Sequence, residues 1–289
     1  MQTDMTHDYE VIGICFQVTS KCNLKCPICF VELNKYTSQD YDYNVEIINK
    51  LKNFGVKKIN FTGGEALTYK HIIELATYTK KLGIKSALST NGILLKEQHL
   101  NCFDEISISV DAIEQEVTNL HRTSQCRNEI IIKSLELSLL PYKKAIFEIA
   151  TVVTNKNINQ LYKILNIINK YSIKKWKLYQ YSSLIQKENA FSKFKINTEE
   201  FYDAVQKIQM QIDIYNLNIE IDYRYAANAA LNSYITVFPD GSLALSDNNK
   251  YKIIGHILSI QTKHEFYKLL KINNFNFKGH KKRHFRDVQ

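Results

Sequence analysis

Three cysteines stand close together near the start of the chain, within the stretch TSKCNLKCPICF that spans residues 19–30. They are Cys22, Cys26 and Cys29. A structural zinc site needs four protein ligands, and a catalytic zinc site with three is usually built from histidines or carboxylates, none of which lies in this stretch. A cubane iron–sulfur cluster takes thiolates readily, and three of them leave one of its four irons open. The pattern favours an iron–sulfur centre with an open position.

Polar or glycine-rich motifs occur at three further places: TGGE at 62–65, STNG at 89–92 and SVD at 109–111. Each of them ends a run of apolar and β-branched residues that predicts a strand, and the cysteines also follow such a run. In α/β sheets and barrels, ligand sites gather at the carboxyl ends of the strands. We therefore expect the cysteines and these motifs to lie on one rim of the fold.

The elements that must position these motifs alternate between strand and helix patterns. Strands are predicted at 11–19, 56–64, 84–92, 105–111, 145–154 and 174–182, and helices at 45–55, 71–83, 94–101, 127–140 and 158–171. This alternation predicts an α/β fold with a parallel sheet, either an open doubly wound sheet or an incomplete barrel.

The pattern changes after about residue 190. A helix is predicted at 197–212, a strand at 219–223, and a β-hairpin at 233–247 whose turn is Pro239-Asp240-Gly241. We therefore divide the chain into a core domain at 1–190, a C-terminal extension at 191–262 and a basic tail at 263–289.

The formal net charge of +9 is concentrated in that tail, which holds eight Lys or Arg residues against one Glu and one Asp. The simpler interpretation is a solvated, partly disordered end, and the alternative is an anion-binding arm over the active site. Because the rest of the chain carries little net charge, we do not expect nucleic acid as a partner.

Composition also limits the cellular setting. No run of about 18 apolar residues is present, so no membrane span is expected. The N-terminus MQTDMTHDYE lacks the features of a secretory signal, and six cysteines are too few for a disulfide scaffold. These observations predict a cytoplasmic protein in which clustered cysteines serve metal binding or catalysis.

The segment CNLKCPICF resembles the C-x3-C-x-φ-C motif of the radical S-adenosylmethionine (SAM) superfamily, with Ile28 as the apolar residue φ. The resemblance implies a partial (β/α)6 TIM-type barrel in which Cys22, Cys26 and Cys29 ligate one [4Fe-4S] cluster. It implies that SAM chelates the fourth iron and is cleaved reductively to a 5′-deoxyadenosyl radical, which takes a hydrogen atom from the substrate. A reductant such as flavodoxin or ferredoxin is implied as a partner.

The resemblance extends to the other motifs. TGGE is similar to the family's glycine-rich motif, in which the backbone around Gly63, Gly64 and Glu65 meets the methionine ammonium group of SAM. The family usually places proline after the glutamate, whereas this chain has Ala66. Further cofactor contacts are implied for seven residues, namely Ser89 and Asn91 in STNG, Ser109 and Asp111 near the ribose or carboxylate, Arg122 at the methionine carboxylate, and Val153 and the Phe30 backbone at the adenine.

The substrate is less clearly indicated. The hairpin ITVFPDGSLALSD resembles the start of the SPASM extension of peptide maturases, although no cysteine follows Cys126 in the sequence. Residues 174–189 are similar to a stretch in peptide-maturing radical enzymes and in viperin, an antiviral nucleotide dehydratase, but Phe30-Val31-Glu32 departs from viperin's Phe-His-Thr. These features favour a peptide or protein substrate. A nucleotide or another small molecule is the alternative, and a non-catalytic iron–sulfur or zinc-binding protein is the alternative of another class.

Three cysteines remain outside the motif. Cys15 lies in an apolar strand and is expected to be buried, as free cysteine often is. Cys102 and Cys126 are far apart in the sequence and have no third thiol near them. A single cluster is therefore predicted.

Overall fold

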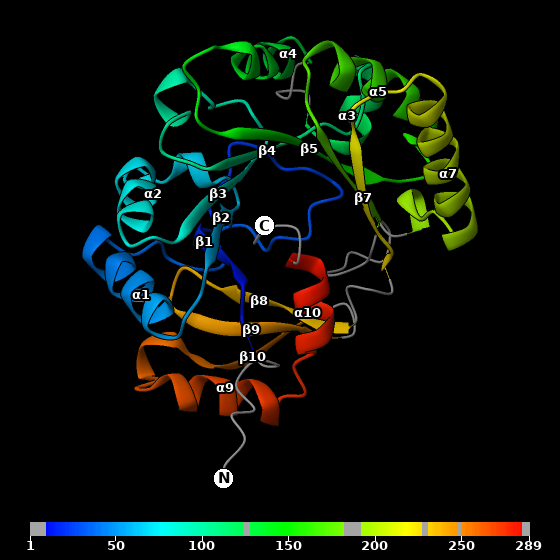
Figure 1. The fold of residues 1–289 in the computed structure, drawn as a ribbon. Coiled ribbons are helices and arrows are strands. Elements are labelled where there is room, and N and C mark those ends of the chain that lie inside the picture. Colours follow the sequence, from blue (N-terminus) through cyan, green and yellow to red (C-terminus); the bar gives the residue numbers. More distant parts are fainter. Residues whose placement is uncertain (1–9, 124–127, 182–191, 227–230, 248–249, 285–289) are drawn as a thin grey trace. The chain divides into compact units, whose positions relative to one another are not determined.

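The computed structural model describes residues 10–123, 128–181, 192–226, 231–247 and 250–284 (Figure 1). The chain divides into two compact units. The first unit comprises the described parts of Met1–Lys21, Glu32–Ala87 and Ala229–Gln289, and the second those of Cys22–Val31 and Leu88–Asn228. The peptide bond between Lys21 and Cys22 thus leads from one unit into the cysteine loop of the other.

The first unit is built around strand β1 (Gly13–Thr19), which pairs in parallel with β2 (Lys58–Gly63) and β8 (Leu231–Val237). Strand β8 continues antiparallel into β9 (Ser242–Asp247), and β9 into β10 (Lys250–His256). Strand β3 (Lys85–Thr90) follows β2 in the sheet order, and its residues from Leu88 onward are counted with the second unit. The helices of this unit are α1 (Tyr41–Asn53), α2 (Ile72–Lys81), α9 (Lys263–Ile272) and α10 (Phe277–His284).

The second unit holds four consecutive parallel strands: β4 (Glu105–Ser109), β5 (Ile146–Val153), β6 (Lys175–Gln180) and β7 (Glu220–Arg224). Its helices are α3 (Gln115–His121), α4 (Asn128–Glu136), α5 (Leu161–Lys170) and α7 (Thr198–Ile214). Short 3-10 turns occur in both units at Ala66–Thr68, Glu97–His99, Leu137–Leu139, Ile158–Gln160 and Ile257–Ser259.

Strands β5 and β6 have two different faces because side chains alternate along a strand. On one face Ile149, Trp176 and Leu178 are fully buried, and α5 and α7 contribute apolar residues such as Ile164 and Phe201. Figure 1 shows these two helices next to each other beside the strands, in agreement with their contacts. The opposite face carries Glu148, Lys175, Lys177 and Tyr179, so the apolar core positions a polar surface on the other side of the sheet.

The strand–helix alternation and the parallel pairing confirm the predicted α/β class. The six predicted strands and the later helix, strand and hairpin are present, with boundaries that differ by a few residues. The sequence did not predict α3 or β10. The division into a core domain, an extension and a tail remains a prediction.

The C-terminal residues differ from the solvated, partly disordered end that the sequence indicated. Residues 263–272 and 277–284 form helices α9 and α10. Phe266 of α9 stacks on Phe54 of α1 with ring centroids 4.8 Å apart, and His280 of α10 is buried. Aromatic packing and a buried histidine therefore hold this basic segment in the first unit. Among the described helices, none combines the length and apolar character needed to cross a membrane.

Candidate active site

The two ends of the cysteine loop are tied together at Ser20. The Ser20 hydroxyl donates to the Tyr36 carbonyl oxygen at 2.6 Å and accepts from the Tyr36 N–H at 3.1 Å. The Ser20 carbonyl oxygen accepts from the Asn34 N–H at 3.0 Å. The chain therefore leaves β1 and returns after the cysteines through a closed stem.

Gly63 and Gly64 let the end of β2 pack against this stem. The Gly64 N–H donates to the Thr19 carbonyl oxygen at 2.9 Å, and the Glu65 N–H donates to the Lys21 carbonyl oxygen at 2.8 Å. Gly63 has a φ of +155°, and a Cβ added to Gly64 would lie 2.2 Å from the Lys21 carbonyl oxygen. Only glycine fits such a close backbone approach. Both glycines of TGGE are therefore needed for the end of β2 to pack against the backbone that leads into Cys22.

The cysteine loop itself carries sulfur atoms that accept backbone hydrogen bonds. The Leu24 N–H donates to Cys22 Sγ at 3.3 Å, and the Val31 N–H donates to Cys29 Sγ at 3.4 Å. Such bonds stabilise thiolates and tune iron–sulfur clusters. All three cysteines are half-buried. Among the described residues no three His, Cys, Asp or Glu side chains surround a point where a metal ion would sit. Three half-buried thiols, two of which accept N–H hydrogen bonds, nevertheless fit an iron–sulfur cluster as a donor set.

The pKa of the Cys26 thiol is shifted by burial and by neighbouring titratable groups. Burial raises the pKa of its thiol to about 12, and the Arg122 guanidinium opposes this increase. Cys29, Asp111 and Cys22 raise the pKa further. The residues that act on Cys26 therefore include four of the positions that the sequence assigned to the cluster or to the cofactor.

Asn91, at the end of β3, is connected to the cysteine loop. Its Nδ2 donates to Asn23 Oδ1 at 2.8 Å, and its Oδ1 accepts from the Ile93 N–H at 3.0 Å. Asn23 directly follows Cys22. The amide predicted to reach the cofactor thus also fixes the loop that carries the thiols.

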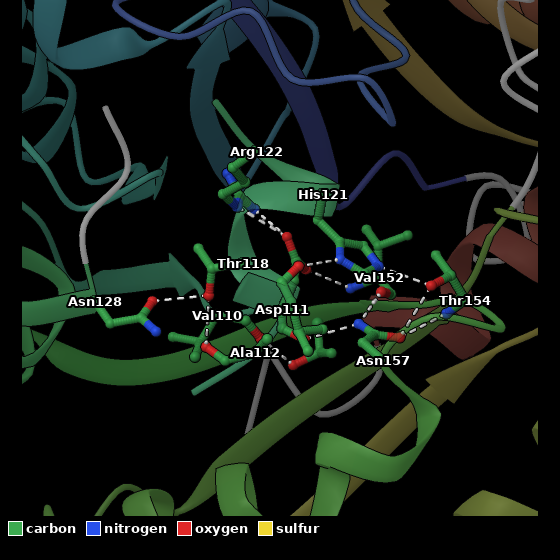
Figure 2. A network of polar contacts seen from close by, with 12 residues as sticks. Val110, Asp111, Ala112, Thr118, His121, Arg122, Asn128, Val152, Thr154 and Asn157 are labelled. Atoms are coloured by element: carbon green, nitrogen blue, oxygen red, sulfur yellow. Dashed lines mark hydrogen bonds and ion pairs between the residues drawn. The ribbon is translucent and has the colours of Figure 1, made fainter. Parts of the chain in front are cut away.

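Asp111 and Arg122 form a buried ion pair at the end of β4 (Figure 2). Asp111 Oδ2 accepts from Arg122 Nε at 2.8 Å and lies 2.7 Å from Arg122 Nη2. Asp111 Oδ1 accepts from the Val152 N–H at 2.9 Å. The sequence treated these residues as separate cofactor contacts, whereas the structure joins them and gives both Asp111 oxygens protein partners.

The profile of the radical SAM superfamily matches residues 16–168, just over half of the chain, and these residues carry the cysteine loop, both glycine motifs and the Asp111–Arg122 pair. The chain belongs to the radical SAM superfamily. As a member, it is an enzyme that uses a [4Fe-4S] cluster and SAM, and both cofactor predictions are confirmed.

Curated relatives include nucleotide-modifying enzymes. The chain is 25% identical over 267 residues to an S-adenosylmethionine-dependent nucleotide dehydratase of Flammeovirga pacifica, covering 87% of this chain and 88% of that protein. It is 24% identical to a dehydratase of the same description from Selenomonas ruminantium, covering 84% and 89%. A GTP 3′,8-cyclase of Clostridium botulinum is 28% identical over 58% of this chain and 56% of that enzyme.

Solved structures with a similar fold include peptide-binding enzymes. SuiB of Streptococcus suis, bound to its precursor peptide SuiA, matches with a TM-score of 0.74 at 16% identity over 90% of this chain. The chain spans 65% of the SuiB chain. The enzyme anSMEcpe, with bound AdoMet and a Cp18Cys peptide, matches with a TM-score of 0.73 at 18% identity, covering 94% of this chain and 84% of that one. At these identities the likeness concerns the fold alone, and it confirms the predicted partial barrel.

The remaining predicted SAM contacts differ in their exposure. Ser89 and Ser109 are half-buried at the ends of β3 and β4, and Phe30 is 44% exposed. Val153 is fully buried, whereas its neighbour Val152 is half-buried and bonded to Asp111 through its N–H. Of this pair, Val152 has the more accessible side chain. The roles of all these residues remain predictions.

Sequence reasoning missed the polar residues behind the radical SAM motifs. Asn157, Thr154 and His121 are fully buried and connect β5 and α3 to Asp111. The available signal was the polar stretch Thr154-Asn155-Lys156-Asn157, which begins at the last residue of a predicted strand, as the recognised motifs lie at strand ends.

Proposed function

We propose that this radical SAM enzyme acts on a nucleotide or a closely related phosphorylated small molecule. The observation that carries this proposal is an array of three cations and one aromatic ring on the polar face of β5, β6 and β7, formed by Lys175, Lys177, Arg224 and Tyr179. The two dehydratases that align with more than four fifths of this chain provide independent support.

The first part of this array is centred on Glu148 of β5. Its carboxylate pairs with Lys175 Nζ at 3.2 Å and also with Lys177 Nζ. The Glu148 side chain is 3% exposed, whereas the two lysines retain 19% and 16% exposure. A buried anion therefore holds two lysines whose side chains remain partly exposed.

The second part lies on the next strand. Arg224 Nη2 lies 2.7 Å from Asp222 Oδ2, and the Arg224 guanidinium stands over the Tyr179 ring at 5.7 Å. Burial raises the pKa of Asp222, but the charges of Arg224, Lys177 and Lys175 outweigh burial and hold it below its ordinary value. Asp222 is therefore ionised at neutral pH and fixes the orientation of Arg224.

The array lies on neighbouring strands beside the candidate SAM site. Val152, whose N–H binds Asp111, pairs in register with Tyr179, and Tyr179 pairs with Arg224. Neighbouring strands lie about 4.8 Å apart, so Arg224 stands roughly 10 Å from Val152. Phosphate groups suit Arg and Lys as ligands, and a base suits an aromatic ring as a stacking surface. A nucleotide on this face would lie beside the cofactor.

We assign the cofactor site to the motifs described above. Cys22, Cys26 and Cys29 hold the cluster, the TGGE backbone takes the methionine ammonium group, and Arg122 takes the methionine carboxylate. When bound, the cluster and SAM supply one-electron chemistry that removes a hydrogen atom from the substrate. The chain's own residues bind and orient these groups, and a donor such as flavodoxin or ferredoxin supplies the electron.

The test compares substrates and charges in one assay. The anaerobically reconstituted protein, given a strong reductant, is incubated with each of the four ribonucleoside triphosphates or with short peptides, and 5′-deoxyadenosine and substrate mass are followed. Stimulation by one nucleotide supports the proposal. Arg224→Ala and Lys177→Ala should then raise the KM for that nucleotide roughly tenfold or more, since each removes a charge-assisted contact. The exposed Lys207→Ala serves as the matched control.

A peptide or protein substrate, favoured by the sequence, is the second candidate. The β8–β9 hairpin and the fold likeness to SuiB and anSMEcpe favour it. Turnover of peptides without any response to nucleotides would replace the first proposal with this one.

A further inference from the structure

The residues that follow β4 are fixed by side chains from three different positions (Figure 2). Three of the four backbone carbonyl oxygens from 110 to 113 accept a hydrogen bond from one of them. The donors are Thr151 Oγ1 to Val110 at 2.6 Å, Asn157 Nδ2 to Asp111 at 2.8 Å, and Asn128 Nδ2 to Ile113 at 2.5 Å, and Asn128 Oδ1 in turn accepts from the Thr118 hydroxyl at 2.8 Å. The backbone that carries the Asp111 carboxylate is therefore clamped along its length.

Asn157 differs from the other donors because its side chain binds the backbone of both Asp111 and Val152, two residues that also bind each other. Its Nδ2 donates to the Asp111 carbonyl oxygen and to the Val152 carbonyl oxygen, both at 2.8 Å. The Val152 N–H in turn donates to Asp111 Oδ1. The buried Asn157 amide thus sets the distance between Asp111, just after β4, and Val152 of β5, whose N–H binds the Asp111 carboxylate.

The side-chain oxygen of Asn157 connects this residue to Arg122 through Thr154 and His121. Asn157 Oδ1 accepts from the Thr154 N–H at 2.8 Å, and Thr154 Oγ1 lies 2.7 Å from His121 Nε2. His121 Nδ1 donates to the Val117 carbonyl oxygen at 2.9 Å, and His121 is the residue before Arg122. Arg122, Asp111, Asn157, Thr154 and His121 therefore form a closed ring that fixes the backbone of Arg122 and the anion that orients its guanidinium.

We propose that Asn157 is a positioning residue for Arg122 and thereby sets the affinity of the enzyme for SAM. This inference rests on the proposed contact between Arg122 and the methionine carboxylate. A guanidinium binds a carboxylate well only when its planar donors are aimed at it. Without the Asn157 amide, the backbone at Asp111 would be free to move and its distance from Val152 would no longer be fixed. Arg122, which Asp111 holds, would then lose its fixed orientation.

The test is a double-mutant cycle on SAM binding. The wild type, Asn157→Ala, Arg122→Ala and the double variant are reconstituted anaerobically, and the dissociation constant of SAM is measured by equilibrium dialysis. Iron content and the thermal unfolding midpoint are recorded alongside. We expect Asn157→Ala to weaken SAM binding about tenfold at unchanged iron content, and to have almost no further effect when Arg122 is already alanine. In turnover, the KM for SAM should rise while kcat stays within about twofold.

Two further variants separate positioning from general stability. Asn232→Ala, in the other unit, removes an asparagine whose Nδ2 donates to the Asn273 and Asn274 carbonyl oxygens at 2.7 and 3.0 Å, and it should lower the unfolding midpoint without changing SAM affinity. Should Asn157→Ala not fold, Asn157→Asp takes its place, since it keeps the size and the acceptor for Thr154 but loses both donors. The inference is wrong if Asn157→Ala weakens SAM binding by the same factor in the wild type and in Arg122→Ala, or if it leaves SAM binding unchanged. An unchanged affinity in Arg122→Ala would instead refute the proposed role of Arg122 itself.

Discussion

Two nitrogens of Arg122 converge on a single carboxylate oxygen of Asp111, at 2.8 Å from Nε and 2.7 Å from Nη2. The Asp111 side chain is 1% exposed and the Arg122 side chain 12%. A buried pair of this kind keeps both charges in place because removing either leaves the other unpaired. Arg122 is therefore oriented before any ligand arrives.

Replacing Arg122 by lysine should weaken SAM binding almost as much as replacing it by alanine. Lysine keeps the charge, but it cannot reproduce the planar fork that binds Asp111 and a ligand carboxylate together. We expect a loss of about 1.5–3 kcal/mol, or roughly ten- to a hundredfold in the dissociation constant, at unchanged iron content. Lys163→Ala, which removes an exposed ion pair with Glu114, is the control. Wild-type affinity in Arg122→Lys would remove the guanidinium from the SAM site.

Gly64→Ala should damage the cysteine loop without touching a cysteine. Its new Cβ would lie 2.2 Å from the Lys21 carbonyl oxygen and 2.9 Å from that of Ser20, so the backbone before Cys22 must move. We expect the variant to lose about 1–3 kcal/mol of unfolding free energy and to retain less iron after reconstitution.

Gly255→Ala is the matched control for this variant, because its Cβ would meet only the flexible end of Leu269 at 3.3 Å. Iron content and thermal unfolding are compared between the two variants. Equal iron content would show that the β2 end and the cysteine loop are independent.

The sequence predicted the parts of the candidate site that depend on local pattern. The cysteine spacing, the glycines of TGGE and the polar ends of β3 and β4 can be read directly, because each short motif carries its own chemical requirement. Asn157 and His121 could not be found in this way. Their partners Asp111 and Thr154 lie 46 and 33 residues away in the chain, and buried asparagine or histidine has no periodic pattern.

The same reason explains why helix α10 was not expected. Its sequence FKGHKKRH is strongly basic and lacks an apolar stripe, which is typical of a solvated end. The helix is held by buried His280, whose ring bonds to the Ile12 N–H just before β1 and to the Ser233 carbonyl oxygen of β8, more than 40 residues distant in the chain. Its first residue, Phe277, also stacks on Tyr267 of α9. Such contacts follow from the tertiary structure and not from composition.

One cluster per chain is expected, and only the three loop cysteines should matter for iron. Cys26→Ala should lose most of its iron and all SAM cleavage, since two thiolates hold a cubane poorly. Cys15 is half-buried within β1, which differs from the buried position expected, and the Cys102 Sγ donates to the Gln98 carbonyl oxygen at 3.3 Å. Cys126 lies outside the described residues.

The measurement is iron and sulfide content after anaerobic reconstitution, with 5′-deoxyadenosine formed in the presence of dithionite as the readout of SAM cleavage. The triple variant Cys15→Ala, Cys102→Ala, Cys126→Ala serves as the counterpart of Cys26→Ala. It should match the wild type, with about four irons per chain. A loss of about four irons in the triple variant would reveal a second cluster and would strengthen the peptide-maturase alternative.

The stability of the first unit should depend on pH through His280. Its Nδ1 donates to the Ser233 carbonyl oxygen at 3.0 Å, and its Nε2 accepts from the Ile12 N–H at 3.1 Å, so the buried ring is neutral. Burial and the neighbouring His284 lower the pKa of His280 from 6.5 to about 4. Protonation would place a hydrogen where the Ile12 N–H already points.

The direction of the pH effect on the unfolding free energy follows from proton binding. Between pH 6.5 and 4 the unfolded chain binds a proton at this histidine and the folded chain does not, so the unfolding free energy falls as the pH falls. The loss should reach about 3 kcal/mol near pH 4 and then level off. His280→Gln should be less stable than the wild type at pH 7.5 but should show a flatter decline. The exposed His264→Gln should decline as the wild type does. Urea unfolding of the wild type and the two variants is followed by far-UV circular dichroism, which responds to the helices and strands of the first unit, and identical pH profiles for the wild type and His280→Gln would contradict the assignment.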